Sequence, residues 1–166
     1  MTVRLLTEKD AQAYRDLRLE ALQKNPEAFA AIFEDEQKNP LEYYQKRLKR
    51  NEFWTYGYFV QNELVGIVTL LREQGPKLHH RSSIVAMYVT EKVRKRGIGK
   101  ELMQAAIEQA KKIDGIEQIY LSVVTTNISA IALYQALDFE IYGTEKRALK
   151  TVDGTYWDEY HMVLFL

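Results

Sequence analysis

The stretch that decides the fold reads Met87-Tyr-Val-Thr-Glu-Lys-Val-Arg-Lys-Arg-Gly-Ile-Gly-Lys-Glu-Leu102. It completes an apolar run, Ser83 to Val89, that is typical of a buried central strand. A charged connection then leads into a helix that we expect to run from Gly97 to about Asp114. Gly97 and Gly99 lie at the start of this helix, where backbone N–H groups have no partner within the helix. A buried strand that feeds a glycine-containing turn and a helix predicts an α/β protein.

The turn is also locally basic, in a chain whose 23 Lys and Arg residues balance 23 Asp and Glu residues. A helix N-terminus has a partial positive charge, and glycines let a ligand approach the backbone. The turn therefore predicts a phosphate or pyrophosphate site, with a simple tight turn or a solvated loop as the alternative. Two other phosphate motifs do not fit, because there is no Gly-x-x-x-x-Gly-Lys-Ser/Thr and Leu102 replaces the third glycine of Gly-x-Gly-x-x-Gly. The nearby cations are Lys92, Arg94, Lys95, Arg96 and Lys100.

Outward from this stretch, the periodicity of apolar residues predicts one mixed sheet. Strand–helix–strand connections imply parallel pairing at its centre, and hairpins imply antiparallel wings. We expect a single α/β domain over residues 1–166, with a mostly antiparallel sheet of about seven strands and helices on both faces. The expected strands are 3–6, 55–60, 64–71, 83–89, 119–124, 139–152 and 155–166, and the expected helices are 7–25, 28–37, 40–51, 97–114 and 129–137.

The composition excludes several classes of protein. The 166 residues are 46% hydrophobic and include no Cys and three His, which argues against disulfides, thiol nucleophiles and a metal site. A net charge of zero gives no long-range electrostatic attraction to nucleic acid. No run of residues approaches the roughly 20 apolar residues of a membrane helix. The charged N-terminus is unlike a signal peptide. We expect a cytoplasmic protein without nucleic-acid or membrane partners, either a monomer or a homodimer.

Two motifs resemble those of the GCN5-related N-acetyltransferase (GNAT) superfamily. Arg94-Lys-Arg-Gly-Ile-Gly99, after a strand and opening a helix, looks like its Arg/Gln-x-x-Gly-x-Gly/Ala signature. Asn127-Ile-Ser-Ala-Ile-Ala-Leu-Tyr-Gln-Ala-Leu-Asp-Phe139 resembles its second motif, an Asn after a strand followed by a short helix with Leu-Tyr. Because the order of the elements also matches over nearly the whole chain, the resemblance implies the acyl-CoA N-acyltransferase-like fold.

The resemblance implies acetyl-coenzyme A (acetyl-CoA) as the acyl donor and no metal. The pyrophosphate would lie on the backbone N–H groups of the turn, and the pantetheine arm would pair with the end of the central strand as an added strand does. Asn127 would contact the arm, and Tyr134 would lie near the sulfur. The implied binding residues are Met87, Tyr88, Val89, Arg94, Lys95, Arg96, Gly97, Ile98, Gly99, Lys100, Asn127, Ala130 and Tyr134.

The implied reaction is direct transfer to a primary amine of a small molecule, peptide or protein. The N–H of Val89 would polarise the thioester carbonyl, and Tyr134 would be the catalytic acid that protonates the departing sulfur. A core aromatic is the alternative role for Tyr134, and a helix cap is the alternative for Asn127. The alternative functions are a catalytically silent CoA-binding sensor or regulatory module, or a phosphate-binding regulator.

The sequence departs from the family pattern at two places. Asp138 precedes Phe139 where Gly is usual, which predicts a left-handed backbone at Asp138. Ala86 and Met87 occupy the positions on the central strand where many members have a carboxylate as general base. The base would then be water or another carboxylate, such as Glu20, Glu34, Glu36 or Asp158. Acidic residues in the first helices and the last hairpin would favour a cationic amine, although exposed acids are common on any surface; they are Glu20, Glu27, Glu34, Asp35, Glu36, Asp158 and Glu159.

Overall fold

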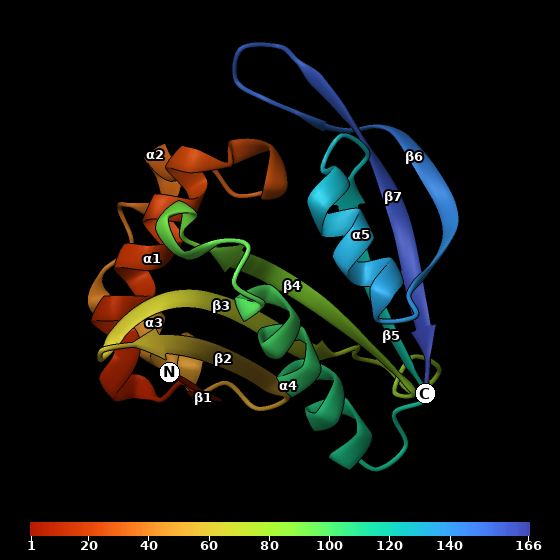
Figure 1. Cartoon of the computed structure of the whole chain (residues 1–166), viewed down its shortest axis with the longest axis horizontal. Coiled ribbons are helices and arrows are strands. Elements are labelled where there is room, and N and C mark those ends of the chain that lie inside the picture. The colour runs from red at the N-terminus through yellow and green to blue at the C-terminus, as the bar shows by residue number, and fades with distance from the viewer.

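One seven-stranded sheet runs through the computed structural model, which describes all 166 residues (Figure 1). The order of the strands is β1-β2-β3-β4-β5-β7-β6, and only β4 and β5 are parallel. The predicted mixed, mostly antiparallel sheet is therefore confirmed. The strands are β1 (Thr2–Leu5), β2 (Phe53–Val60), β3 (Glu63–Arg72), β4 (Arg81–Val89), β5 (Gln118–Val124), β6 (Glu140–Lys150) and β7 (Tyr156–Phe165).

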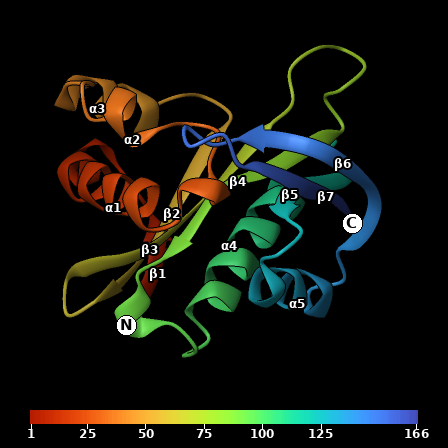
Figure 2. The ribbon, with the colours of Figure 1, turned by 90° about the horizontal axis from the view of Figure 1, so that it is seen from above.

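The helices cover both faces of this sheet, as predicted (Figure 2). One face bears α1 (Ala11–Lys24), α2 (Phe33–Glu36) and α3 (Leu41–Leu48), and the other bears α4 (Ile98–Lys112) and α5 (Ile128–Ala136). Each side has its own apolar core, because α1 and α3 bury Tyr14 and Tyr44 near Ile67, whereas α4 buries Leu102 and Met103 on the opposite face.

The segment 28–37 differs from the expected short helix. A 3-10 turn spans Pro26–Ala28, and the single turn of α2 begins only at Phe33. The backbone at Phe29 and at Ile32 is extended, because Phe29 packs against the core under α1. Tertiary packing thus overrides the helical pattern here.

Strand β4 contains a β-bulge that the sequence did not reveal. Thr69 pairs with Val85 and Ile67 pairs with Tyr88, so both Ala86 and Met87 lie opposite one residue of β3. Ala86 has a φ of 54°, a left-handed conformation that costs a non-glycine residue about 1 kcal/mol. A bulge bends its strand and re-aims the neighbouring groups.

Strands β4 and β5 pair only at their beginnings. The parallel register covers Arg81–Ser83 on β4 and Gln118–Tyr120 on β5. Beyond these residues the two strands separate, which Figure 1 shows as a V with its apex near the C-terminus. The sheet is thereby opened at its centre, next to the bulge.

One local prediction about the backbone is confirmed. Asp138 has a φ of 67°, the left-handed conformation expected where the family has Gly. The register of β6 shifts twice, between Ile141 and Gly143 and between Glu145 and Leu149.

Candidate active site

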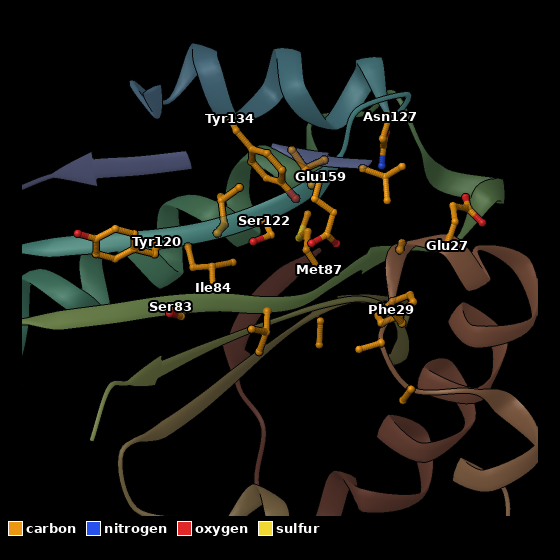
Figure 3. A pocket seen from close by; sticks show the side chains of 18 of the residues that line it. Glu27, Phe29, Ser83, Ile84, Met87, Tyr120, Ser122, Asn127, Tyr134 and Glu159 are labelled. Carbon is orange, nitrogen blue, oxygen red and sulfur yellow. The ribbon is translucent and has the colours of Figure 1, made fainter. Parts of the chain in front are cut away.

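A cavity of about 510 Å³ lies where β4 and β5 separate (Figure 3). Its walls come from the diverging halves of both strands, and Tyr134 and Asn127 extend into it from α5 and from the loop before it. Residues of the α1–α3 side and of the β6–β7 hairpin line the rest: Arg18, Glu27, Ala28, Phe29, Ala30, Ala31, Arg47, Tyr142 and Glu159.

The first turn of α4 presents a row of unpaired amides. None of the backbone N–H groups from Lys95 to Lys100 donates a hydrogen bond within the chain. Gly97, the N-cap, has a φ of 81°, and a Cβ there would meet no atom within 4 Å, so the backbone is open on that side. The five predicted cations are all exposed, and none forms an ion pair. The unpaired amides and the positive side chains together favour the binding of an anion.

Arg94 fastens this turn to the end of β4. Its Nε donates to the carbonyl oxygen of Val89 at 2.8 Å, and one of its terminal nitrogens donates to Oδ1 of Asn25 at 2.9 Å. The N–H of Thr90 bonds to Val65 on β3, so the main-chain groups of Val89 point the opposite way, toward the gap. No strand pairs with Val89 on that side, because β5 pairs with β4 only as far as Ser83.

Gly99 lies where α4, β4 and α5 meet. A Cβ at Gly99 would come within 3.2 Å of both the terminal methyl of Met87 and the Cδ2 of Leu133. The two predicted motifs and the central strand therefore converge at one point. Tyr88 behaves differently, since its ring is buried on the α1 side and its hydroxyl donates to Glu20 at 2.9 Å. Only the main chain of Tyr88 is available on the α4 side.

Tyr134 is packed in the core, and its hydroxyl reaches the cavity. Its side chain is 6% exposed and packs edge-on against Phe139, with ring centroids 6.1 Å apart. Its hydroxyl is directed into the cavity and makes no hydrogen bond within the chain (Figure 3). Burial raises the pKa of Tyr134 to about 12, so the phenol keeps its proton at neutral pH.

Asn127 is the N-cap of α5, the alternative role considered for it. Its Oδ1 accepts the N–H of Ala130 at 3.3 Å. The side-chain NH₂ group has no partner in the chain, and Figure 3 shows it directed toward the cavity. The cap therefore leaves two donors available to a ligand.

The four carboxylates considered as bases do not line the cavity. Glu20 accepts hydrogen bonds from the hydroxyls of Tyr88 and Thr90, and Glu36 is buried in an ion pair with Arg18. Asp158 accepts from Lys146 and from the backbone of Arg147, which hold its pKa below the usual range. Glu34 lies exposed on α2.

Glu159 is among the acidic residues that the sequence suggested on the acceptor side, but the sequence analysis did not consider it as a base. It lines the cavity from β7 and forms no side-chain hydrogen bond. Burial raises its pKa, with a smaller opposing contribution from His161 and a further raising one from Glu145. Side chains alternate along a strand, so Glu159 and Asp158 face opposite sides of β7. That alternation is the signal that could have separated them.

Two further observations concern metal ions and membranes. No group of three or more His, Asp and Glu side chains lies close enough together to hold a metal ion. None of the helices has the length and apolar character needed to cross a bilayer. The opened strand pair, the amide-rich turn and the capped α5 lie around one cavity.

Residues 12–139 match the model of the acetyltransferase (GNAT) family. The chain belongs to the acetyltransferase (GNAT) family, which confirms the resemblance found in its sequence. It is accordingly an N-acetyltransferase, a class whose acyl donor is acetyl-CoA.

The chain is also similar to named acetyltransferases and to solved structures. It is 29% identical over 126 residues to an N-alpha-acetyltransferase of Saccharolobus solfataricus, covering 72% of this chain and 71% of the relative. It is 32% identical over 104 residues to the L-amino acid N-acetyltransferase AaaT of Escherichia coli, covering 62% of each chain. A GNAT-family acetyltransferase structure from Streptococcus pneumoniae superimposes with a TM-score of 0.84 at 22% identity, covering 99% of both chains. The last likeness confirms the fold.

Proposed function

We propose that this protein transfers an acetyl group directly from acetyl-CoA to a primary amine of a small molecule or peptide. The observation that supports this proposal is the row of unpaired amides from Lys95 to Lys100 beside the gap between β4 and β5. The amides suit a diphosphate, and the gap suits an extended arm that ends in a thioester.

The donor would be held by main chain more than by side chains. The N–H groups of the turn from Lys95 to Lys100, Ile98 and Gly99 included, would bind the diphosphate, and the cations of the turn would add charge. The N–H of Val89 would pair with the arm, Met87 would pack against it, and the NH₂ group of Asn127 would donate to it near Ala130. Bound acetyl-CoA supplies an activated acyl carbon.

Catalysis on the donor side would use Val89 and Tyr134. An N–H aimed into the gap can stabilise the negative charge that develops on the acyl oxygen. The hydroxyl of Tyr134, which has no partner in the chain, can donate its proton to the departing sulfur. Its pKa of about 12 ensures that this proton is present at neutral pH. A chain without Cys cannot form a cysteinyl intermediate, so transfer is direct.

The acceptor would enter from the opposite side of the cavity, past Phe29, Tyr142 and Glu159. A partly buried carboxylate without a partner attracts an ammonium group, which favours a cationic amine. The names of the two relatives above, an N-alpha-acetyltransferase and an L-amino acid N-acetyltransferase, both indicate an α-amino group as the acceptor. An α-amino group is therefore the acceptor to test first.

The cavity also contains a guanidinium that could distinguish these two acceptors. Arg18 is paired with Glu36, but Arg47 has no carboxylate partner and its Nε is buried without a hydrogen bond. The free carboxylate of an amino acid would pair with Arg47. A peptide offers only an amide carbonyl at the equivalent position, which would bind the guanidinium less strongly.

The experiment is a free-thiol assay with acetyl-CoA and three matched acceptors: an L-amino acid, its amide, and a dipeptide that begins with the same residue. We expect turnover with at least one acceptor and its loss in Tyr134→Phe. A preference for the amino acid that disappears in Arg47→Gln would assign the carboxylate to Arg47. Tight CoA binding without turnover of any amine would instead support the silent sensor.

A further inference from the structure

Three hydrogen-bonded side chains form a line across β5, β7 and β6 beside the cavity. The Oγ of Ser122 lies 2.8 Å from Nδ1 of His161, and Nε2 of His161 lies 2.9 Å from Oε2 of Glu145. Ser122 and His161 are direct partners in the β5–β7 register, and Glu145 stands two cross-strand pairs along, opposite Glu159. We call these three residues the Ser–His–Glu line.

One end of the Ser–His–Glu line reaches the acceptor side of the cavity. Leu121 and Val123 are buried in the core under α4, so Ser122, which lies between them, projects from the opposite face of β5. Ser122 lines the cavity, and Figure 3 shows it directed into the same region as Tyr134 and Glu159. An amine in this part of the cavity would lose its proton beside the hydroxyl of Ser122.

The packing around the imidazole holds it in place. The rings of Tyr142 and His161 are tilted by 33°, with centroids 6.0 Å apart, and the ring of Tyr142 meets that of Tyr120 edge-on at 5.7 Å. The titratable groups that face His161 are therefore Glu145 and Tyr142 from β6, Glu159 from β7 and Tyr120 from β5. Glu145 forms no ion pair with a Lys or Arg, so the imidazole of His161 is the basic group that its carboxylate contacts.

The partners of the imidazole determine which nitrogen has the proton. An ionised carboxylate only accepts hydrogen bonds, so Nε2 of His161 is the nitrogen that donates, to Glu145. Nδ1 then has a free lone pair and accepts the hydroxyl of Ser122. The remaining lone pairs of the Ser122 oxygen are free to accept an N–H from the cavity.

We propose that the Ser–His–Glu line removes the proton of the acceptor amine. This inference rests on the proposed function. The acceptor ammonium breaks one N–H bond and gives that proton to Oγ of Ser122. The lone pair left on nitrogen then forms the C–N bond as the C–S bond breaks, and the second N–H proton is lost to water. The hydroxyl proton of Ser122 passes at the same time to Nδ1 of His161. Glu145 stabilises the resulting imidazolium, which loses a proton to water because the side chain of His161 is 28% exposed. The departing sulfur takes its proton from Tyr134.

This assignment supplies the base that the central strand lacks. Ala86 and Met87 have no titratable group, and the four carboxylates considered from the sequence lie outside the cavity. Two carboxylates line the same cavity. Glu27 accepts the side-chain NH₂ group of Asn25 at 3.5 Å, so Glu159, which has no hydrogen-bond partner, is the competing base. The two differ in their expected effect: Glu159 acts on the ammonium and changes KM, whereas the Ser–His–Glu line acts on proton transfer and changes kcat.

The test compares the pH profiles of kcat and KM for the acceptor in the wild type, Ser122→Ala, His161→Gln, Glu145→Gln and Glu159→Gln. His79→Gln, in the exposed loop between β3 and β4, is the matched control. We expect kcat at pH 7 to fall about 10- to 100-fold in Ser122→Ala and His161→Gln, with acceptor KM within about threefold, in the range usual for general bases. The deficit should shrink at higher pH, where the amine loses its proton unaided.

Two outcomes would overturn the inference. Wild-type kcat and pH profile in a folded His161→Gln would exclude the line, and so would a loss of kcat in Glu159→Gln alone. If the wild type acetylates no amine, the proposed function fails and this inference with it. A readout besides activity is the ¹⁵N spectrum of His161, in which we expect the Nε2–H tautomer in the wild type; an Nδ1–H tautomer would contradict the direction of transfer.

Discussion

The Nε of Arg94 donates a hydrogen bond of 2.8 Å to the carbonyl oxygen of Val89, across the start of the basic turn. The same guanidinium holds Asn25 at the end of α1 and lies over the ring of Tyr88. One side chain thus joins the turn proposed for the diphosphate to the strand proposed for the pantetheine arm. The two halves of the donor site are positioned together.

Replacing Arg94 with Lys should separate these halves while keeping the charge. A lysine cannot supply two directed donors from a planar group. We expect the Kd for CoA to rise about fivefold to tenfold in Arg94→Lys, or about 1 kcal/mol, as one hydrogen bond contributes. Calorimetric titration measures it, with Arg50→Lys as the control at an exposed site. An unchanged Kd would mean that Arg94 does not organise the turn.

Gly97 and Gly154 form a matched pair for testing the turn. Both have a left-handed backbone, with φ of 81° and 88°, and at both a Cβ would meet nothing within 4 Å. Changing either to Ala should therefore cost about 1 kcal/mol of folding free energy, from backbone strain alone. Only Gly97→Ala should also weaken CoA binding, because its methyl group would stand among the amides. Equal Kd values in the two variants would contradict this placement.

Tyr134→Phe should separate catalysis from stability. The hydroxyl has no partner in the chain, so we expect the free energy of unfolding and the Kd for CoA to stay nearly unchanged. The value of kcat should fall about 10- to 100-fold if the phenol protonates the sulfur. Tyr56→Phe is the converse control, because the hydroxyl of Tyr56 donates to Gln109 at 2.9 Å away from the cavity. Its loss should cost about 1 kcal/mol of stability and leave kcat intact.

Tyr134 should also make folding sensitive to alkaline pH. Its pKa is about 12 in the folded chain and about 10 in the unfolded chain. Above pH 10 the unfolded chain loses this proton first, so the free energy of unfolding falls as the pH rises. At pH 11 the loss from this one group is about 1.4 kcal/mol, the value of one pKa unit. The free energy of unfolding, measured in urea, should therefore fall less between pH 8 and pH 11 in Tyr134→Phe than in the wild type. An equal fall in both proteins would contradict the raised pKa of Tyr134.

Much of the fold could be predicted because its signals are local. Asp153-Gly154 marks the last hairpin, and Gly97 and Gly99 mark the start of α4. The motif that ends at Phe139 even indicated the left-handed Asp138. The β4 bulge could not be read in this way, because an Ala at position 86 gives no local sign of a positive φ. The bulge follows from pairing with β3 and not from the residue itself.

The proton-accepting side of the site escaped prediction for a similar reason. Ser122, Glu145 and His161 are far apart in the sequence, and only the register of three strands brings them together. The four carboxylates that the sequence suggested as bases lie outside the cavity, and Glu36, for example, is paired with Arg18. A binding site made of backbone groups can be predicted from a short motif. A cluster of side chains from several strands can be predicted only when the pairing register of those strands is known.

The central claim is that the amides from Lys95 to Lys100 bind the diphosphate of the donor. Amide hydrogen exchange of the protein alone, with CoA, and with pantetheine, which lacks the diphosphate, tests it most directly. We predict that CoA slows exchange at residues 97–100 at least tenfold and that pantetheine slows it only near Val89. Unchanged exchange at residues 97–100 with saturating CoA, or equal protection by pantetheine, would contradict the claim.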